Sequence, residues 1–211
     1  MLDLLPPLPT FLAFLVAGLA LNITPGADMT FVAVSAGRGG WRGGLAAAAG
    51  VTLGCFAHIA FAAVGLSALI AASATAFAIV KYAGVAYLLF LAVQLARQKD
   101  NAKVESPPAP PTPWDALRRA ALVNVLNPKV GIFFLAFLPQ FVVPGPNLGL
   151  KIAALGLVFN ATGFLVNAAV ALAVALTARR LAAKWLPRAA RLFAASVMGA
   201  LAMRLALTSR H

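Results

Sequence analysis

Three long stretches without a charged residue constrain the fold of this chain most strongly. Residues 4–27, 43–80 and 152–178 contain no Asp, Glu, Lys or Arg. A helix needs about 20 apolar residues to cross the hydrocarbon core of a bilayer, and each stretch exceeds that length. The chain as a whole is 62% hydrophobic and 10% charged, with a mean hydropathy of +0.92. Soluble domains are only about half apolar, so the sequence predicts an all-α membrane protein.

Charge clusters and breaks rich in Pro and Gly divide the chain into about six expected transmembrane helices. The sixth is interrupted by Arg191 and Arg204, so we expect it to be short, tilted or partly interfacial. The expected helices cover residues 9–34, 44–70, 76–96, 116–142, 149–178 and 188–208.

A Pro-rich segment separates two halves of the chain. Residues 97–115 include the string SPPAPPTP and are predicted to form an extended cytoplasmic linker. Residues 1–96 and 116–211 then contain three expected helices each, and an odd number of crossings reverses the orientation of the second half. The predicted architecture is therefore two inverted three-helix repeats.

The distribution of Lys and Arg predicts the orientation. Twelve of these residues lie in the loops after the first, third and fifth helices, and four lie on the opposite side. By the positive-inside rule the first group is cytoplasmic and both termini lie outside. The N-terminus has no basic residue before its first apolar stretch, so we expect the first helix to be retained.

Composition also argues against several classes of protein. The net charge of +12 is spread between apolar segments instead of being gathered on one face, which is not typical of a nucleic-acid binder. Cys55 is the only cysteine, so no disulfide, CxxC pair or cysteine zinc site can form within the chain. His58 and His211 are too few for a histidine metal cluster. We expect no nucleic-acid partner, metal or cofactor.

The first expected helix contains a break, where residues 22–28 read NITPGAD. Proline removes an intrahelical hydrogen bond and clashes with the preceding turn, so the helix should stop or kink there. Thr24 is predicted to be an N-cap and Pro25 the first residue of a second half-helix.

The fourth expected helix repeats this pattern, since residues 124–129 read NVLNPK. Asn127 is predicted to be the cap and Pro128 the first residue of the next half-helix. Both breaks should lie roughly 15 to 23 Å into a hydrocarbon layer of about 30 Å. The two breaks are therefore expected near the middle of the membrane.

Two broken helices of this kind favour a binding site. Half-helix N-termini attract a carboxylate, while unwound carbonyls and Asp28 attract an ammonium group, and an amino acid offers both charges. The alternative is that both prolines are kinks satisfied by neighbouring helices. The predicted substrate site comprises Asn22, Thr24, Pro25, Gly26, Asp28, Asn127, Pro128 and Lys129.

Asp28 and Lys129 are the only ionisable residues deep in these two helices, and an unpaired charge there costs at least about 2.5 to 3.5 kcal/mol. We expect Lys129 to need an anion, either Asp28 or a substrate carboxylate; the alternative is that its side chain reaches the cytoplasmic headgroups. Asp28 and His58 are the candidates for proton coupling. His58 has the alternative role of a neutral histidine that is hydrogen-bonded inside the helix bundle.

Gly50 and Gly54 form a small-xxx-small spacing that lets helices approach closely. Packing within one chain and a homodimer explain this spacing equally well.

At the level of motifs the chain resembles the LysE/RhtB family of amino-acid exporters. The similarity lies in NITPGADM, GLAAAAGVTLGCFAH, VKYAGVAYLLFLAVQLAR and NVLNPKVGIFFLAFLPQFV, within roughly the first 145 residues. The family commonly has Pro-Gly-Pro where this chain has Pro25-Gly26-Ala27. The resemblance implies a bacterial inner-membrane protein that exports amino acids or related metabolites in exchange for protons.

Two other functions are alternatives to export. A membrane scaffold would need only the glycine-rich faces and basic loops, and would not need paired breaks in the membrane interior. An intramembrane enzyme would need a catalytic group of residues, and the sequence has neither an HExxH motif nor a second buried carboxylate. We therefore expect a transporter and not an enzyme.

Overall fold

The computed structural model describes residues 4–66, 112–143 and 145–177, with isolated positions between 75 and 93 and at 196 and 203. The expected helices at 76–96 and 188–208 and most of the linker at 97–115 lie outside the continuous ranges. The regular elements within those ranges are helices: α1 (Leu8–Ile23), α2 (Ala27–Phe61), the π-helix η1 (Ala62–Leu66), α5 (Pro113–Val125), α6 (Pro128–Ile132), the π-helix η2 (Phe133–Phe137), the 3-10 helix η3 (Leu138–Phe141) and α7 (Leu148–Thr177).

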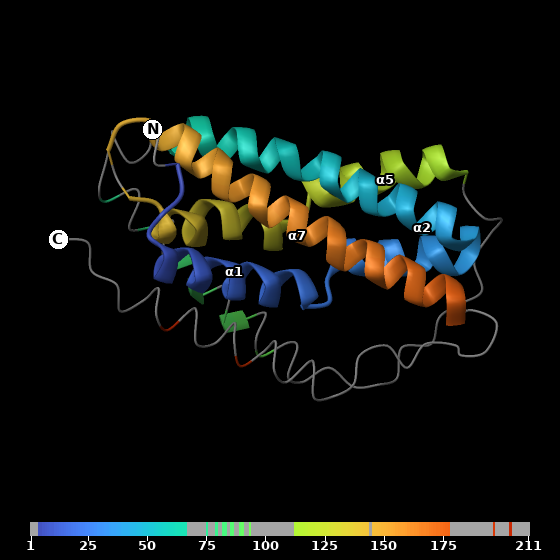
Figure 1. Cartoon of the computed structure of the whole chain (residues 1–211). Helices are drawn as coiled ribbons and strands as arrows, with labels where there is room; N and C mark the ends of the chain where they lie inside the picture. Colours follow the sequence, from blue (N-terminus) through green and yellow to red (C-terminus); the bar gives the residue numbers. More distant parts are fainter. Residues whose placement is uncertain are drawn as a thin grey trace.

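The first break lies between α1 and α2, and α2 then reverses direction at Gly40. Gly40 has φ 62° and ψ −163°, a left-handed conformation that glycine adopts without steric cost. Residues 27–39 and 41–61 therefore form two arms of a helical hairpin (Figure 1). The arms pack closely, since a Cβ on Gly44 would lie 2.7 Å from that of Ala36. This reversal corresponds to the expected loop between residues 34 and 44.

The second break lies between α5 and α6, where the two segments Pro113–Val125 and Pro128–Phe141 meet at a bend of 47°. Figure 1 shows that α1 and α5 approach the middle of the bundle from opposite ends and that both breaks lie near its mid-length. After the break, α6, η2 and η3 continue along the bundle in the same direction in which α5 runs.

Two hydrophobic clusters lie on either side of the breaks. One consists largely of aromatic and branched residues from α1, η2, η3 and the first half of α7, including Phe14, Phe133 and Phe159. The other is built mainly from alanine and valine of α2, α5 and the last part of α7, including Ala48 and Ala120. Small residues let helix backbones come close together in a membrane. Both clusters reach the first break, since Leu21 belongs to the first cluster and Val32 to the second.

Length and hydropathy identify membrane-crossing candidates among the described residues. Ala27–Gly65 and Leu148–Leu176 qualify, and the bent pair around the second break is a third if it counts as one span. The first of these ranges contains the reversal at Gly40, and α1 is a shorter apolar helix. The expected helix at 149–178 corresponds to α7, and the expected helix at 116–142 corresponds to α5 through η3.

Gly50 and Gly54 contact α5 of the same chain. A Cβ on Gly54 would lie 2.5 Å from the carbonyl oxygen of Ala121, and one on Gly50 would collide with the carbonyl of Leu117. Of the two explanations left open by the sequence, packing within one chain therefore accounts for this spacing.

Candidate functional site

The side chain of Lys129 crosses from the second break to the first. Its Nζ donates hydrogen bonds to the carbonyl oxygens of Leu21 at 3.0 Å and Thr24 at 2.9 Å. In an unbroken helix the Leu21 carbonyl would accept from the N–H of residue 25, but Pro25 has none. The ammonium also lies at the C-terminal end of α1, where the helix dipole favours a cation.

This geometry corrects the sequence-based interpretation of Lys129. The side chain is only 8% exposed, so it does not reach the headgroups. Its hydrogen-bond partners are backbone carbonyls, and no ion pair with Asp28 is found among the described residues. Of the two anions expected for Lys129, Asp28 is therefore not a direct partner, because the broken end of α1 already offers two acceptors.

Thr24 is the C-cap of α1, and the prediction that it caps a second half-helix is wrong. Its Oγ1 donates to the Ala20 carbonyl at 2.7 Å, one turn back in α1. Thr24 and Gly26 are extended on either side of Pro25, and α2 begins at Ala27 with Gly26 as its N-cap. The prediction that Pro25 is the first residue of a half-helix is therefore wrong as well. Gly26 leaves room for the lysine, since a Cβ there would lie 3.3 Å from Lys129 Nζ.

The prediction for the second break is confirmed. Asn127 is the N-cap of α6, and its Oδ1 accepts a hydrogen bond from the backbone N–H of Lys129 at 3.0 Å. Pro128 occupies the first helical position, where its missing N–H is not needed. The cap fixes the start of α6, from which the Lys129 side chain extends towards α1.

Asp28 is linked to the second break in return. It lies in the first turn of α2, where the helix dipole favours a carboxylate, and it is 8% exposed. Its Oδ2 accepts a hydrogen bond from Asn124 Nδ2 at 3.0 Å. The first break thus provides an anion to α5, and the second break provides a cation to α1, so two polar links cross between the broken segments.

His58, on the second arm of α2, contacts the same group. Its Nε2 lies 2.9 Å from the carbonyl oxygen of Asn124, and because a carbonyl only accepts, Nε2 carries the hydrogen. The imidazole stacks on Phe134 with ring centroids 6.0 Å apart. This is the contact expected of a histidine hydrogen-bonded within the bundle. Through Asn124, His58 is connected to Asp28.

Asn22 binds α7, away from the lysine. Its Nδ2 donates to Thr162 Oγ1 at 3.1 Å and to the Phe159 carbonyl at 3.3 Å. On the same helix, between these two residues, Asn160 donates to the Thr52 carbonyl at 3.2 Å. This hydrogen bond connects α7 with the second arm of α2. These contacts place a third, polar wall beside the two breaks.

A cavity of about 30 Å³ lies where these elements meet. This volume is sufficient for about two water molecules. Three buried polar atoms of the site have no hydrogen bond among the described residues: Asp28 Oδ1, Asn124 Oδ1 and Asn127 Nδ2. Because buried polar groups are nearly always paired, these atoms are candidates to bind a ligand. The lining residues are Asn22, Asp28, Met29, Val51, Cys55, Asn124, Lys129, Val130, Phe159, Asn160, Gly163 and Asn167.

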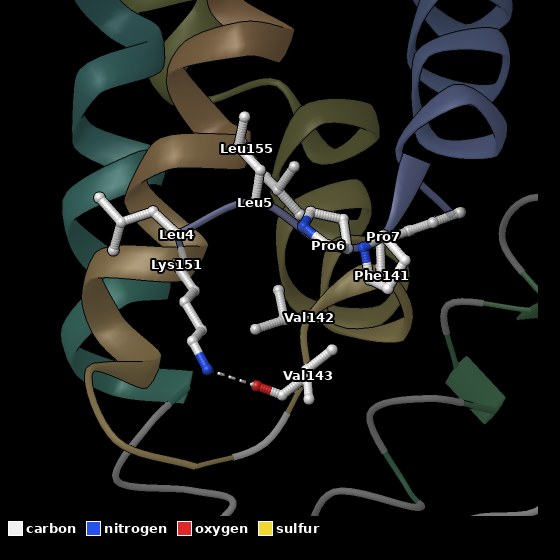
Figure 2. Close-up of a pocket in the computed structure, with 9 residues that line it drawn as sticks. All are labelled: Leu4, Leu5, Pro6, Pro7, Phe141, Val142, Val143, Lys151 and Leu155. Atoms are coloured by element: carbon white, nitrogen blue, oxygen red, sulfur yellow. Dashed lines mark hydrogen bonds between the residues drawn. The ribbon is translucent and has the colours of Figure 1, made fainter. Parts of the chain in front are cut away.

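A larger cavity of about 560 Å³ lies at the end of the bundle where α1 and α7 begin. Figure 2 shows its lining, which is apolar except for Lys151, whose Nζ donates to the Val143 carbonyl at 3.3 Å. A series of packed aromatic rings connects the linings of the two cavities. Phe141 in the larger cavity contacts Phe14 with ring centroids 5.5 Å apart, and Phe133 stacks on Phe159 of the smaller cavity at 4.3 Å.

Three residues of the site were not predicted from the sequence: Asn124, Asn160 and Asn167. Asn124 lies in the NVLNPK string and belongs to the site because it contacts both Asp28 and His58. Asn160 and Asn167 are seven residues apart, so they share a face of α7, and both line the small cavity. Two amides on one face of a largely apolar helix are the signal in the sequence that points to them.

The sequence of the chain is similar to those of several known proteins. A family model described as LysE type translocator matches residues 19–209. A homoserine/homoserine lactone efflux protein of Salmonella typhimurium is 33% identical over 172 residues, which cover 81% of each chain. A leucine efflux protein of Salmonella choleraesuis is 29% identical over 153 residues, 72% of each chain. An uncharacterized membrane protein of Pseudomonas aeruginosa is 33% identical over 184 residues, 84% of this chain and 82% of its own. No solved structure matches.

Proposed function

The chain belongs to the LysE type translocator family, and from this premise we propose that it is a secondary transporter that exports neutral amino acids across the bacterial inner membrane. The observation that carries the proposal is the pair of crossed polar links, Lys129 to the α1 carbonyls and Asn124 to Asp28. A protein that only packed against partners would have no use for charged groups held between two broken helices. The names of the efflux relatives suggest leucine and homoserine as substrates.

We propose that the substrate binds at the small cavity. Asp28 Oδ1 would accept from the substrate ammonium, and the backbone around Thr24, Pro25 and Gly26 and around Asn127 and Pro128 would form the cradle. Asn22 would hold α7 against this cradle. One carboxylate and one ammonium line the cavity, and they match the two charges of a neutral amino acid and leave no partner for a charged substrate side chain.

The transport cycle would follow from two inverted repeats, residues 1–96 and 116–211, joined by the linker 97–115. In support, α1 and α5 run in opposite directions, as do the second arm of α2 and α7 (Figure 1). The multi-pass orientation with both termini outside follows the Lys and Arg distribution. Rocking of the two halves would expose the small cavity to each side in turn.

In this orientation the large cavity of Figure 2 faces outwards and would serve as the exit. The aromatic rings between the cavities would be the barrier that parts when the substrate leaves. With a small cavity of about 30 Å³, the state described is too tight for an amino acid and corresponds to the empty, closed carrier.

We propose proton exchange as the source of energy, with Asp28 and His58 as the carriers. They are connected through Asn124, since its amide binds Asp28 and its carbonyl binds His58. Protonation of Asp28 would weaken its hold on a substrate ammonium, which couples proton entry to substrate release.

The test is efflux of labelled L-leucine and L-homoserine from proteoliposomes. A carboxylate that binds an ammonium contributes a charge-assisted hydrogen bond, so Asp28→Asn is expected to slow efflux about tenfold or more. The matched control is Asp115→Asn, because Asp115 lies at the start of α5 and contacts Thr112 instead of the cavity. Normal efflux by correctly inserted Asp28→Asn would disprove the site.

A further inference from the structure

The ammonium of Lys129 occupies the place in the site that is best suited to a cation. Two backbone carbonyls, those of Leu21 and Thr24, converge on it at 3.0 and 2.9 Å. Both belong to the broken end of α1, which a helix dipole makes negative. The side chain is almost fully buried, so no other group competes for these acceptors from solvent.

Beside this ammonium the site contains acceptors that remain free. Asp28 Oδ1 and Asn124 Oδ1 are buried and have no hydrogen bond among the described residues, and both residues line the small cavity together with Lys129. The carboxylate Asp28 and the ammonium Lys129 therefore share one cavity without forming a direct ion pair. A group with three N–H donors and a positive charge at this point could bind the two carbonyls and Asp28 together.

An amino acid carries such a group. Its α-ammonium has the same charge and the same three donors as the lysine ammonium, and it differs only in not being tethered to the chain. We propose that Lys129 is a built-in substitute for the substrate ammonium, which holds the empty carrier closed and is displaced by the α-ammonium of the incoming amino acid. This inference rests on the proposed export function.

Displacement gives the substrate carboxylate a role. Once the α-ammonium has taken the Leu21 and Thr24 carbonyls, Lys129 is left with a buried charge that needs an anion. The substrate carboxylate is the anion that arrives with the ammonium. An amine without a carboxylate would leave Lys129 unpaired, so the exchange would favour amino acids over the corresponding amines.

Equilibrium binding of matched ligand pairs tests this exchange in purified full-length protein in detergent. The pairs are L-leucine with 3-methylbutan-1-amine and L-homoserine with 3-aminopropan-1-ol, and each amine lacks only the carboxylate. The variants are Lys129→Ala, which leaves space, and Lys129→Met, which keeps the bulk without the charge. Lys151→Ala is the control, since Lys151 is a lysine on the other cavity that also contacts a carbonyl.

The wild type and Lys151→Ala are expected to bind the amino acid about tenfold to a hundredfold more tightly than the amine, which is the value of a charge-assisted hydrogen bond. In Lys129→Ala and Lys129→Met this ratio should fall to about threefold or less, mainly because the amine gains affinity. A monodisperse elution profile establishes that each variant is folded.

An unchanged ratio in either folded Lys129 variant would overturn the inference while leaving the export function intact. Loss of binding of both ligands in the two variants would also overturn it, since Lys129 would then be needed to build the site and not to occupy it. Failure of the wild type to bind or transport either amino acid would instead reject the proposed function, and the inference with it.

Discussion

Lys129 supplies to the first broken segment the hydrogen bond that Pro25 cannot provide. The Leu21 carbonyl has no donor from residue 25, which is proline, and it accepts instead from the Thr24 N–H at 3.2 Å and from Lys129 Nζ at 3.0 Å. The two residues are far apart in the sequence and belong to different broken segments. Each break therefore depends on the other for hydrogen bonds to its polar groups.

Restoring a backbone N–H at residue 25 should impair transport without lowering stability. Pro25→Ala restores an N–H that can bind the Leu21 carbonyl and allows α1 to continue past Thr24, so the midpoint of thermal unfolding should stay the same or rise. Efflux should nevertheless fall about tenfold or more, because the Leu21 carbonyl no longer needs Lys129. Pro113→Ala is the control, as Pro113 lies in the first turn of α5. Normal efflux by Pro25→Ala would contradict this account.

Asn124 should be needed to hold Asp28. Asn124→Leu removes the amide that donates to Asp28 Oδ2 and is expected to lower the free energy of unfolding by about 1 to 3 kcal/mol. The contact with His58 uses the backbone carbonyl and survives the substitution. A double-mutant cycle with Asp28→Asn, measured by chemical denaturation, should give an interaction energy of at least about 0.5 kcal/mol. Strictly additive effects would show that the pair is not coupled.

Gly54 should tolerate no side chain. A Cβ would lie 2.5 Å from the Ala121 carbonyl oxygen and 2.8 Å from Asn124 Cβ, so Gly54→Ala must push α5 away from α2. Overpacking of this kind costs about 1 to 3 kcal/mol, which thermal unfolding in detergent would detect. Gly65→Ala is the control, because its nearest contact would be 3.7 Å away on the Phe61 ring. Equal unfolding midpoints for the two variants would refute the close approach.

Cys55 provides a natural reporter for the small cavity. It is the only cysteine of the chain and is 3% exposed, so a maleimide should label it slowly. Phe14→Ala removes a ring from the barrier between the two cavities and should accelerate labelling several-fold when the reagent is added from the side of the large cavity. Phe61→Ala, at a side chain that is 65% exposed, should leave the rate unchanged. Equal rates for all three proteins would exclude the proposed barrier.

The sequence was sufficient to predict the helices at 116–142 and 149–178 and the positions of both breaks. Charge-free runs and the two prolines are local signals, and the ends of α5, η3 and α7 lie within a few residues of the expected ones. The cap at Asn127 was predictable for the same reason, since an Asn-Pro step at a helix start satisfies a nearby N–H.

The partners of the charged groups were not predictable in this way. Thr24 precedes a proline as an N-cap often does, yet its hydroxyl binds back to Ala20. Charge favoured an anion as the partner of Lys129, either Asp28 or a substrate carboxylate, but carbonyls at a helix end are also strong acceptors and carry no signature in the sequence. Which acceptor is used depends on how the two breaks are placed in space.

The contact of Lys129 with Thr24 spans 105 residues of sequence, and this sets an order of events in biogenesis. During synthesis α1 enters the bilayer long before Lys129 leaves the ribosome. The broken end of α1 can therefore form its hydrogen bonds with Lys129 only at a later stage. The N-terminal half is consequently expected to remain an unfinished intermediate, open to quality-control proteases, until translation of the second half completes it.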